Sequence, residues 1–278
     1  MRISHPAVLS RRRLVLSGSA AAVSLLPWRI GSAQSTWPTK PLRLVVPFAP
    51  GGSSEIVARA VAAEMSKTIG QNVFVDNKPG AAGNIAMQEV ANSTDEHTLI
   101  LGHIGTLAVN PYIFPKLAYD ANRDFAPITL VSKVPSRGTG PMLTDLMAGR
   151  LQAAAVGAPA LLPFIKAGKL RCIATGTAQR LPQLPDVPTV AEQGFKGFEM
   201  TQWYGLMAPS KWPKAHLAKL ETEAVKAARS PLVKEKLSQE TALAVGNTSA
   251  EFDAFIKSEQ ARWKPVIARA QIKPEGMG

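Results

Sequence analysis

The chain has 278 residues, of which 46% are hydrophobic, and its 32 basic and 20 acidic residues give a formal net charge of +12. This length is enough for two small lobes or one large domain. Lysine and arginine are scattered rather than massed beside aromatic residues, which argues against nucleic-acid binding. A single cysteine excludes an intrachain disulfide, and four isolated histidines without grouped carboxylates argue against a metal site.

The first 33 residues are predicted to be an export signal. Three arginines at positions 11–13 precede an apolar run over residues 15–26, and Gly31-Ser32-Ala33 is a small-x-small cleavage pattern. The paired arginines favour a twin-arginine signal over a Sec signal, and the apolar run is shorter than the roughly 20 residues of a membrane span. Removing five arginines and no acid leaves 27 of the 32 basic residues against 20 acids, a net charge of +7. We therefore expect a moderately basic protein in the periplasm.

A strand, a turn of prolines and glycines, and a helix are predicted in succession from residue 42 to residue 65. Residues 42–46 are mostly apolar, and two following prolines end the strand. Apolar residues then recur at helical spacing over residues 55–65, with Ser53 or Ser54 at the expected N-cap. Free N–H groups and the helix dipole at such a junction favour a carboxylate or a phosphate. A plain connection between strand and helix explains the same residues, so this motif alone does not decide between the two.

Strand-like and helix-like stretches alternate after this unit. Strands are predicted at residues 73–77 and 98–102, with a helix at about residues 85–91 between them. This order favours an open α/β sheet of mostly parallel strands, in which ligands bind at the carboxyl ends of the strands. Three loops rich in Gly, Ser, Thr or Asn are expected to meet there, namely residues 47–54, 79–84 and 103–106.

Three helices are predicted near the C-terminus, at residues 214–229, 231–239 and 249–270. The last begins with a capping-box pattern from Thr248 to Glu251. Its apolar stripe is expected to pack in the core: Phe252, Phe255, Ile256 and Trp263.

The single cysteine, Cys172, lies within residues 170–174, which are predicted to form a buried strand. No histidine shows a local pattern with it, and a nucleophilic cysteine needs a neighbouring base. A structural role is therefore favoured for Cys172.

Ordered motifs along most of the chain resemble one protein family. Three of them contain the loops named above, at residues 41–52, 76–84 and 102–111. The others follow in the same order as in the family, at residues 119–120, 124–128, 165–171, 184–192 and 203–209. Together they resemble the Bug-type extracytoplasmic solute receptors, the substrate-binding proteins of tripartite tricarboxylate transporters. The resemblance covers nearly the whole chain after residue 33.

This resemblance implies an α/β fold of the type II periplasmic-binding-protein kind, in which two α/β lobes close like a Venus flytrap. Lobe one would comprise residues 34–128 and 205–278, and residues 129–204 would form lobe two with the hinge crossings. The resemblance also implies a monomeric receptor rather than an enzyme, without cofactor or metal. Its ligand would be a small carboxylate, such as a di- or tricarboxylate, an amino acid or an aromatic acid, passed on to the membrane subunits of the transporter.

In the family, backbone N–H groups and waters from loops of both lobes hold one carboxylate of the ligand. On this chain the resemblance implies ligand contacts from Phe48, Ala49, Pro50, Gly51, Gly52 and Ser53, with support from Gly83, Asn84 and Thr106. Glu55 stands where the family has an acid, often Asp. We interpret its charge as stabilising the helix N-terminus rather than contacting the ligand.

One segment departs from the family pattern. After Pro135 the family continues through further strands and helices, whereas residues 136–150 already resemble the segment that follows that stretch. The first half of lobe two is therefore predicted to be absent, and ligand binding weaker than in intact relatives is expected. Apolar residues of the remaining part are expected to be short of partners: Leu143, Leu146, Met147, Leu161, Leu162 and Ile165.

Two other hypotheses remain open. The chain could be a degenerate or truncated family member with little or no binding. It could also be a periplasmic hydrolase that uses Ser53 or Ser54, which would need a base close to those serines. The sequence does not name the ligand, because backbone N–H groups bind any carboxylate.

Overall fold

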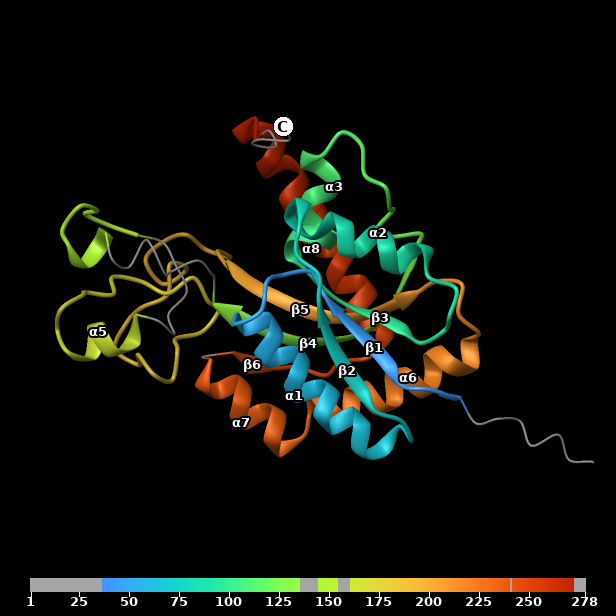
Figure 1. Ribbon diagram of the computed structural model, residues 1–278. Helices are drawn as coiled ribbons and strands as arrows, with labels where there is room; N and C mark the ends of the chain where they lie inside the picture. Colours follow the sequence, from blue (N-terminus) through green and yellow to red (C-terminus); the bar gives the residue numbers. More distant parts are fainter. Residues whose placement is uncertain (1–36, 136–144, 155–160, 241, 273–278) are drawn as a thin grey trace, which may run out of the picture. The chain divides into compact units, whose positions relative to one another are not determined.

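A six-stranded mixed sheet lies at the centre of the computed structural model, with the strand order β2-β1-β3-β5-β4-β6 (Figure 1). The structure describes residues 37–135, 145–154, 161–240 and 242–272. The chain divides into two units, residues 1–34 and 35–278, and the predicted export signal lies outside the described residues. The strands are β1 (Leu42–Val46), β2 (Val73–Asn77), β3 (Thr98–His103), β4 (Phe125–Pro135), β5 (Thr201–Pro209) and β6 (Leu243–Ala244).

The strand directions correct one expectation. β1 pairs in parallel with β2 and β3, as predicted, but β5 runs antiparallel to both β3 and β4, and β6 runs antiparallel to β4. β4 and β5 pair from Phe125 opposite Pro209 to Pro135 opposite Thr201. The chain therefore leaves the sheet at the end of β4 and re-enters it beside that end, at the start of β5. An antiparallel pair needs no crossover helix, and such long-range pairing has no signal in local periodicity.

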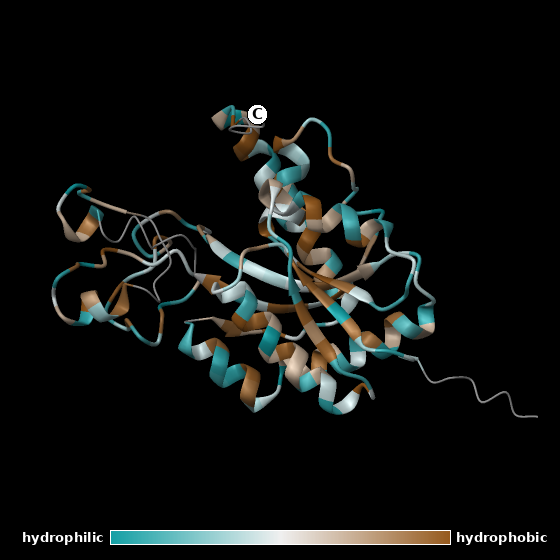
Figure 2. Cartoon of the chain, viewed as in Figure 1, coloured by the Kyte–Doolittle hydropathy of each residue, from teal (hydrophilic) through white to brown (hydrophobic). Residues whose placement is uncertain are grey.

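The alternation of side chains along the strands divides the core between the two faces of the sheet. Leu44 and Val46 of β1 belong to one apolar cluster, and Val45 belongs to the other. The first cluster includes residues of α1 (Ser53–Thr68), α6 (Lys214–Ala228) and α7 (Pro231–Gln239). The second includes residues of α2 (Asn84–Asn92), the π-helical turn η2 (Gly105–Val109) and α8 (Ser249–Ala270). In Figure 2, β1 is mostly brown while the covering helices alternate brown and teal, as expected for a sheet buried on both faces.

The C-terminal helices agree with the sequence prediction. α7 and α8 have the predicted bounds, and α6 ends one residue earlier than predicted. The capping box of α8 is present: Thr248 Oγ1 accepts the Glu251 N–H at 3.2 Å, and Glu251 Oε2 accepts the Thr248 N–H at 2.8 Å. Phe252 and Phe255 flank the buried Trp203 at ring-centroid distances of 6.0 and 5.3 Å. Phe252 and Ile256 of the predicted stripe are buried in the core, and Phe255 and Trp263 pack against it partly buried.

Most described residues between β4 and β5 form turns and irregular segments. The short helix α5 (Leu162–Lys166) lies among them and contains no buried residue. Leu143 lies outside the described residues; of the other five apolar residues expected to lack partners, none is buried. Met147 is exposed and the other four are half-buried, which agrees with a lobe that has lost part of its sheet.

The predicted buried strand at residues 170–174 is wrong. Residues 171–174 form no strand, Cys172 is half-buried and the side chain of Ile173 is 69% exposed. The nearest pairing is an isolated bridge between Thr175 and Thr189. A strand is buried only when neighbouring strands and helices cover it, and this segment has no such neighbours within the described chain.

Candidate ligand-binding site

The three loops predicted to form the site meet at Gly83. This residue lies between the short 3-10 turn η1 (Ala81–Gly83) and α2, with φ +90°. A Cβ atom at this position would lie 2.8 Å from Thr106 Cγ2 and 3.1 Å from Pro47 Cβ. Only glycine allows this contact together with this backbone conformation. The loops at the ends of β1, β2 and β3 therefore converge, as expected.

The N-terminus of α1 forms one side of this site. Within the part of the chain that the structure describes, the N–H groups of Ala49, Gly52 and Ser53 make no hydrogen bond. The first N–H groups of a helix have no partner inside the helix, and the helix dipole places partial positive charge there. Of the N–H groups of residues 48–53, the structure leaves these three available.

The other implied contacts in this loop are used differently. The Phe48 N–H donates to Val46 O at 2.8 Å, and the Gly51 N–H donates to Glu55 Oε2 at 2.5 Å. Pro50 has no N–H to offer. These residues can contact a ligand through ring atoms or carbonyl groups, but their amides do not contribute to an anion site in this state.

Two carboxylates of the protein itself lie beside the start of α1. Glu55 accepts the Gly51 N–H and pairs with Arg59 at 2.6 Å, and these two interactions lower the pKa of its carboxyl. Ser53 Oγ donates to Glu240 Oε2 at 3.0 Å. Neither Ser53 nor Ser54 is the N-cap, because Gly52 occupies that position without a side-chain hydrogen bond. Glu55 thus stabilises the helix start, as interpreted from the sequence.

The side chains of Asn84 and Thr106 hold the loops together. Asn84 Oδ1 accepts a hydrogen bond from Asn110 Nδ2 at 2.7 Å and lies 3.1 Å from the Tyr119 hydroxyl. Thr106 is fully buried, and its Oγ1 accepts the His103 N–H at 3.2 Å. Burial raises the pKa of Tyr119, so this hydroxyl stays protonated as a donor. We infer that Asn84 and Thr106 position the loop backbones rather than contact a ligand.

Two residues that were not among the predicted contacts, His103 and Gln202, lie beside the predicted contact Phe48. The Phe48 and His103 rings lie 4.5 Å apart, and Gln202 Nε2 lies 3.3 Å from His103 Nδ1. The Gly105 N–H also donates to His103 Nδ1, at 2.9 Å, so this nitrogen acts as an acceptor. His103 belongs to the third predicted loop, but Gln202 reaches it only because β5 pairs with β3.

The hydrolase hypothesis would need a base close to Ser53 or Ser54. The carboxylate of Glu240 beside Ser53 could serve as a base, but a serine triad also needs a histidine between the two groups. Within the described residues, no group of three His, Cys, Asp or Glu side chains could hold a metal ion.

Comparisons with known proteins identify the family. The family model described as "Tripartite tricarboxylate transporter family receptor" matches residues 57–135 and 129–272. The chain belongs to this family. A UPF0065 protein of Agrobacterium vitis is 31% identical over 309 residues, covering 89% of each chain. A UPF0065 protein of Pseudomonas sp. (strain P51) is 29% identical over 321 residues, covering 94% of this chain and 95% of its own.

Solved proteins of similar structure include the R. palustris protein "with adipate". It has a TM-score of 0.74 and 29% identity, and the match covers 86% of this chain and 99% of that one. MatC from Rhodopseudomonas palustris, "with bound malate", has a TM-score of 0.72 and 29% identity, with coverages of 83% and 99%. The receptor fold expected from the sequence is therefore confirmed.

The same comparisons support the predicted break in the family pattern. The two matched segments of the family model overlap at residues 129–135, next to the predicted junction after Pro135. The alignment with the Pseudomonas relative spans 321 positions, more than the 278 residues of this chain, so part of that relative faces a gap. Residues 136–144 themselves lie outside the described part.

Proposed function

We propose that this family member is a periplasmic receptor that holds one carboxylate of a small organic acid at the start of α1. The N–H groups of Ala49, Gly52 and Ser53 are the donors, and the Gly83 contact sets the loops around them. The observation that carries the proposal is this group of three available N–H groups at the positive end of a 16-residue helix. Structurally similar receptors solved with adipate and malate support the same ligand class.

The proposed cellular role follows from the family. An exported receptor binds its solute in the periplasm and passes it to membrane subunits of a tripartite tricarboxylate transporter. No helix among the described residues has the length and apolarity needed to cross a membrane.

A pair of substitutions at Ser53 tests the donor role directly. Ser53 is the first residue of α1, where proline is tolerated, and Gly52 before it has φ −102° and ψ 169°, a conformation that suits a residue before proline. Ser53→Pro therefore removes one N–H without breaking the helix. Ser53→Ala keeps the N–H and removes only the hydroxyl that donates to Glu240.

Isothermal titration calorimetry with adipate and malate measures the affinity of the purified chain and of both Ser53 variants. We expect measurable binding, weaker than in relatives with a complete second lobe, and a loss of about tenfold in Ser53→Pro, the lower range for a hydrogen bond to a charged group. Ser53→Ala is expected to bind within about twofold of the unchanged chain. Equal affinity of the two variants would exclude this N–H as a donor. A cooperative melt without a ligand-dependent shift for any mono-, di- or tricarboxylate would instead favour the degenerate family member.

A further inference from the structure

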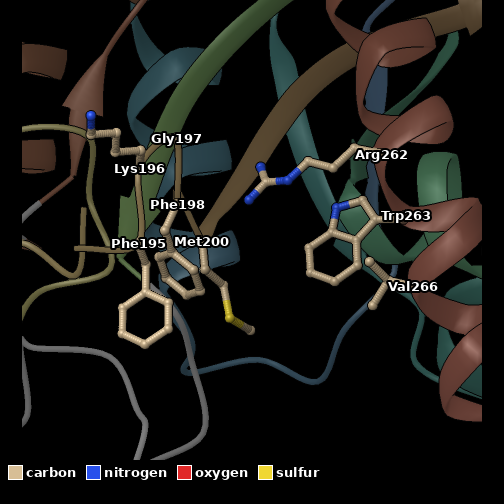
Figure 3. Close-up of a pocket in the computed structure, with 8 residues that line it drawn as sticks. All are labelled: Phe195, Lys196, Gly197, Phe198, Met200, Arg262, Trp263 and Val266. Atoms are coloured by element: carbon tan, nitrogen blue, oxygen red, sulfur yellow. The ribbon is translucent and has the colours of Figure 1, made fainter. Parts of the chain in front are cut away.

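A separate pocket of about 540 Å³ lies between the turn Phe195–Phe198 and the C-terminal half of α8 (Figure 3). The turn is closed by the Phe198 N–H, which donates to Phe195 O at 2.9 Å, with Gly197 at φ +75°. The Met200 N–H donates to Gly176 O at 2.7 Å and fixes the strand start beside the turn. The pocket shares no lining residue with the loops at the start of α1.

The lining of this pocket is apolar and largely aromatic. Phe195 and Met200 are 67% and 46% exposed, and Phe198 is 38% exposed. On the facing side the indole N–H of Trp263 donates to Glu259 at 3.3 Å, which leaves the six-membered ring facing the space toward Met200 (Figure 3). Exposed apolar groups that face one another across a pocket of this size are typical of a binding site for an apolar molecule.

One cationic side chain points into the same pocket. Figure 3 shows the guanidinium of Arg262 pointing from α8 toward Phe198 and Met200, whereas the amino group of Lys196 points away. Arg262 Nη1 donates to Glu259 Oε1 at 3.2 Å. Its other nitrogens make no hydrogen bond within the described residues, and an arginine has five N–H donors.

The carboxylate of Glu259 accepts hydrogen bonds from several donors. This carboxylate is 8% exposed and also accepts the indole N–H of Trp203 at 3.0 Å. Glu259 forms an ion pair with Arg262 through one nitrogen, and the rest of the guanidinium points toward the pocket. A ligand that places one anionic group on Arg262 and an aromatic body between Phe198 and Trp263 matches both features.

We propose that this pocket binds an aromatic monocarboxylate, as a second site beyond the receptor site at α1. A di- or tricarboxylate fits less well because the lining offers one inward cation and an apolar remainder. A neutral apolar molecule would offer no acceptor to the pocket-facing N–H groups of Arg262 that Glu259 does not use.

Naphthalene-2-carboxylate and its neutral analogue naphthalene-2-methanol are suitable probes, measured by isothermal titration and by quenching of tryptophan fluorescence. Arg262→Gln removes the cation, and Arg269→Gln removes an equal charge from the exposed last turn of the same helix as a matched control. Phe198→Ala removes one aromatic ring from the pocket lining. Because Phe198 lies in an exposed turn, this variant is expected to keep the fold. Thermal melts of each variant check the fold.

We expect saturable binding of the carboxylate, weakened about fivefold by Arg262→Gln and unchanged by Arg269→Gln, as for a partly exposed ion pair. Phe198→Ala is expected to weaken both probes about fivefold, and Arg262→Gln to leave the neutral probe unaffected. Absence of saturable carboxylate binding, equal effects of the two arginine variants, or unchanged binding in Phe198→Ala overturns the proposal.

Discussion

Gly83 offers the sharpest test of how the site is assembled. Gly83→Ala forces an alanine to adopt φ +90° and brings its Cβ to 2.8 Å from Thr106 Cγ2 and 3.1 Å from Pro47 Cβ. The left-handed conformation costs about 1–2 kcal/mol for a residue with a Cβ, and overpacking adds about 1–3 kcal/mol. Gly70→Ala is a matched control, because Gly70 has φ +92° and a Cβ added there would have no atom within 4 Å.

Urea unfolding of the two variants separates the two costs. Gly70→Ala is expected to lose about 1–2 kcal/mol of unfolding free energy, and Gly83→Ala at least about 1 kcal/mol more. Only Gly83→Ala is expected to weaken adipate binding in titrations, because only there does the methyl group push the loops of Pro47 and Thr106 apart. Equal losses of stability in both variants would refute the tight contact among the loops.

Three other predictions concern single interactions. Glu240→Gln removes a negative charge beside the start of α1, so adipate is expected to bind about threefold more tightly in titrations, and weaker binding would contradict this electrostatic reasoning. Hydrogen bonds from the Thr248 N–H, the larger cause, and from the Thr248 hydroxyl lower the pKa of Glu251 from 4.5. The charged form of Glu251 therefore stabilises the fold above pH 4.5, and this contribution is lost as the pH falls through the lowered pKa. The melting-temperature advantage over Glu251→Gln should accordingly shrink between pH 5 and pH 3, and a constant advantage would count against the capping box. Gly205→Ala would place a Cβ 1.9 Å from Phe252 Cζ, so the unfolding free energy measured in urea is expected to fall by about 3 kcal/mol. The additional substitution Phe252→Leu is expected to restore part of this loss. Near-normal stability of Gly205→Ala would show that the core repacks freely.

Local patterns were sufficient for much of this structure. The bounds of β1, β2 and α8 agree with the sequence prediction, and so does the capping box of Thr248 and Glu251. These features depend on side-chain periodicity and on hydrogen bonds between residues a few positions apart, which a sequence displays directly. The order of strand ends also predicted which three loops would meet.

Besides the strand directions, two sequence-based expectations failed because they depended on distant partners. Residues 170–174 look like a strand but have no neighbouring strand to pair with in the described chain. The N-cap of α1 is Gly52, while the Ser53 hydroxyl turns to Glu240, a residue 187 positions away. A side chain with two available partners takes the one that the fold supplies, and the sequence does not reveal it.

By itself, the sequence determined the family, the helix and strand segments around the site, and the glycines at its turns. Only the tertiary structure decided that β5 runs antiparallel to β3, which brings Gln202 to His103, and that Glu240 accepts the Ser53 hydroxyl at the start of α1. The physical reason is that strand direction and long-range contacts depend on how the whole chain buries its apolar surface. Local hydrogen bonds and periodicity depend on neighbouring residues, whereas the pairing of strands in a sheet depends on the whole fold.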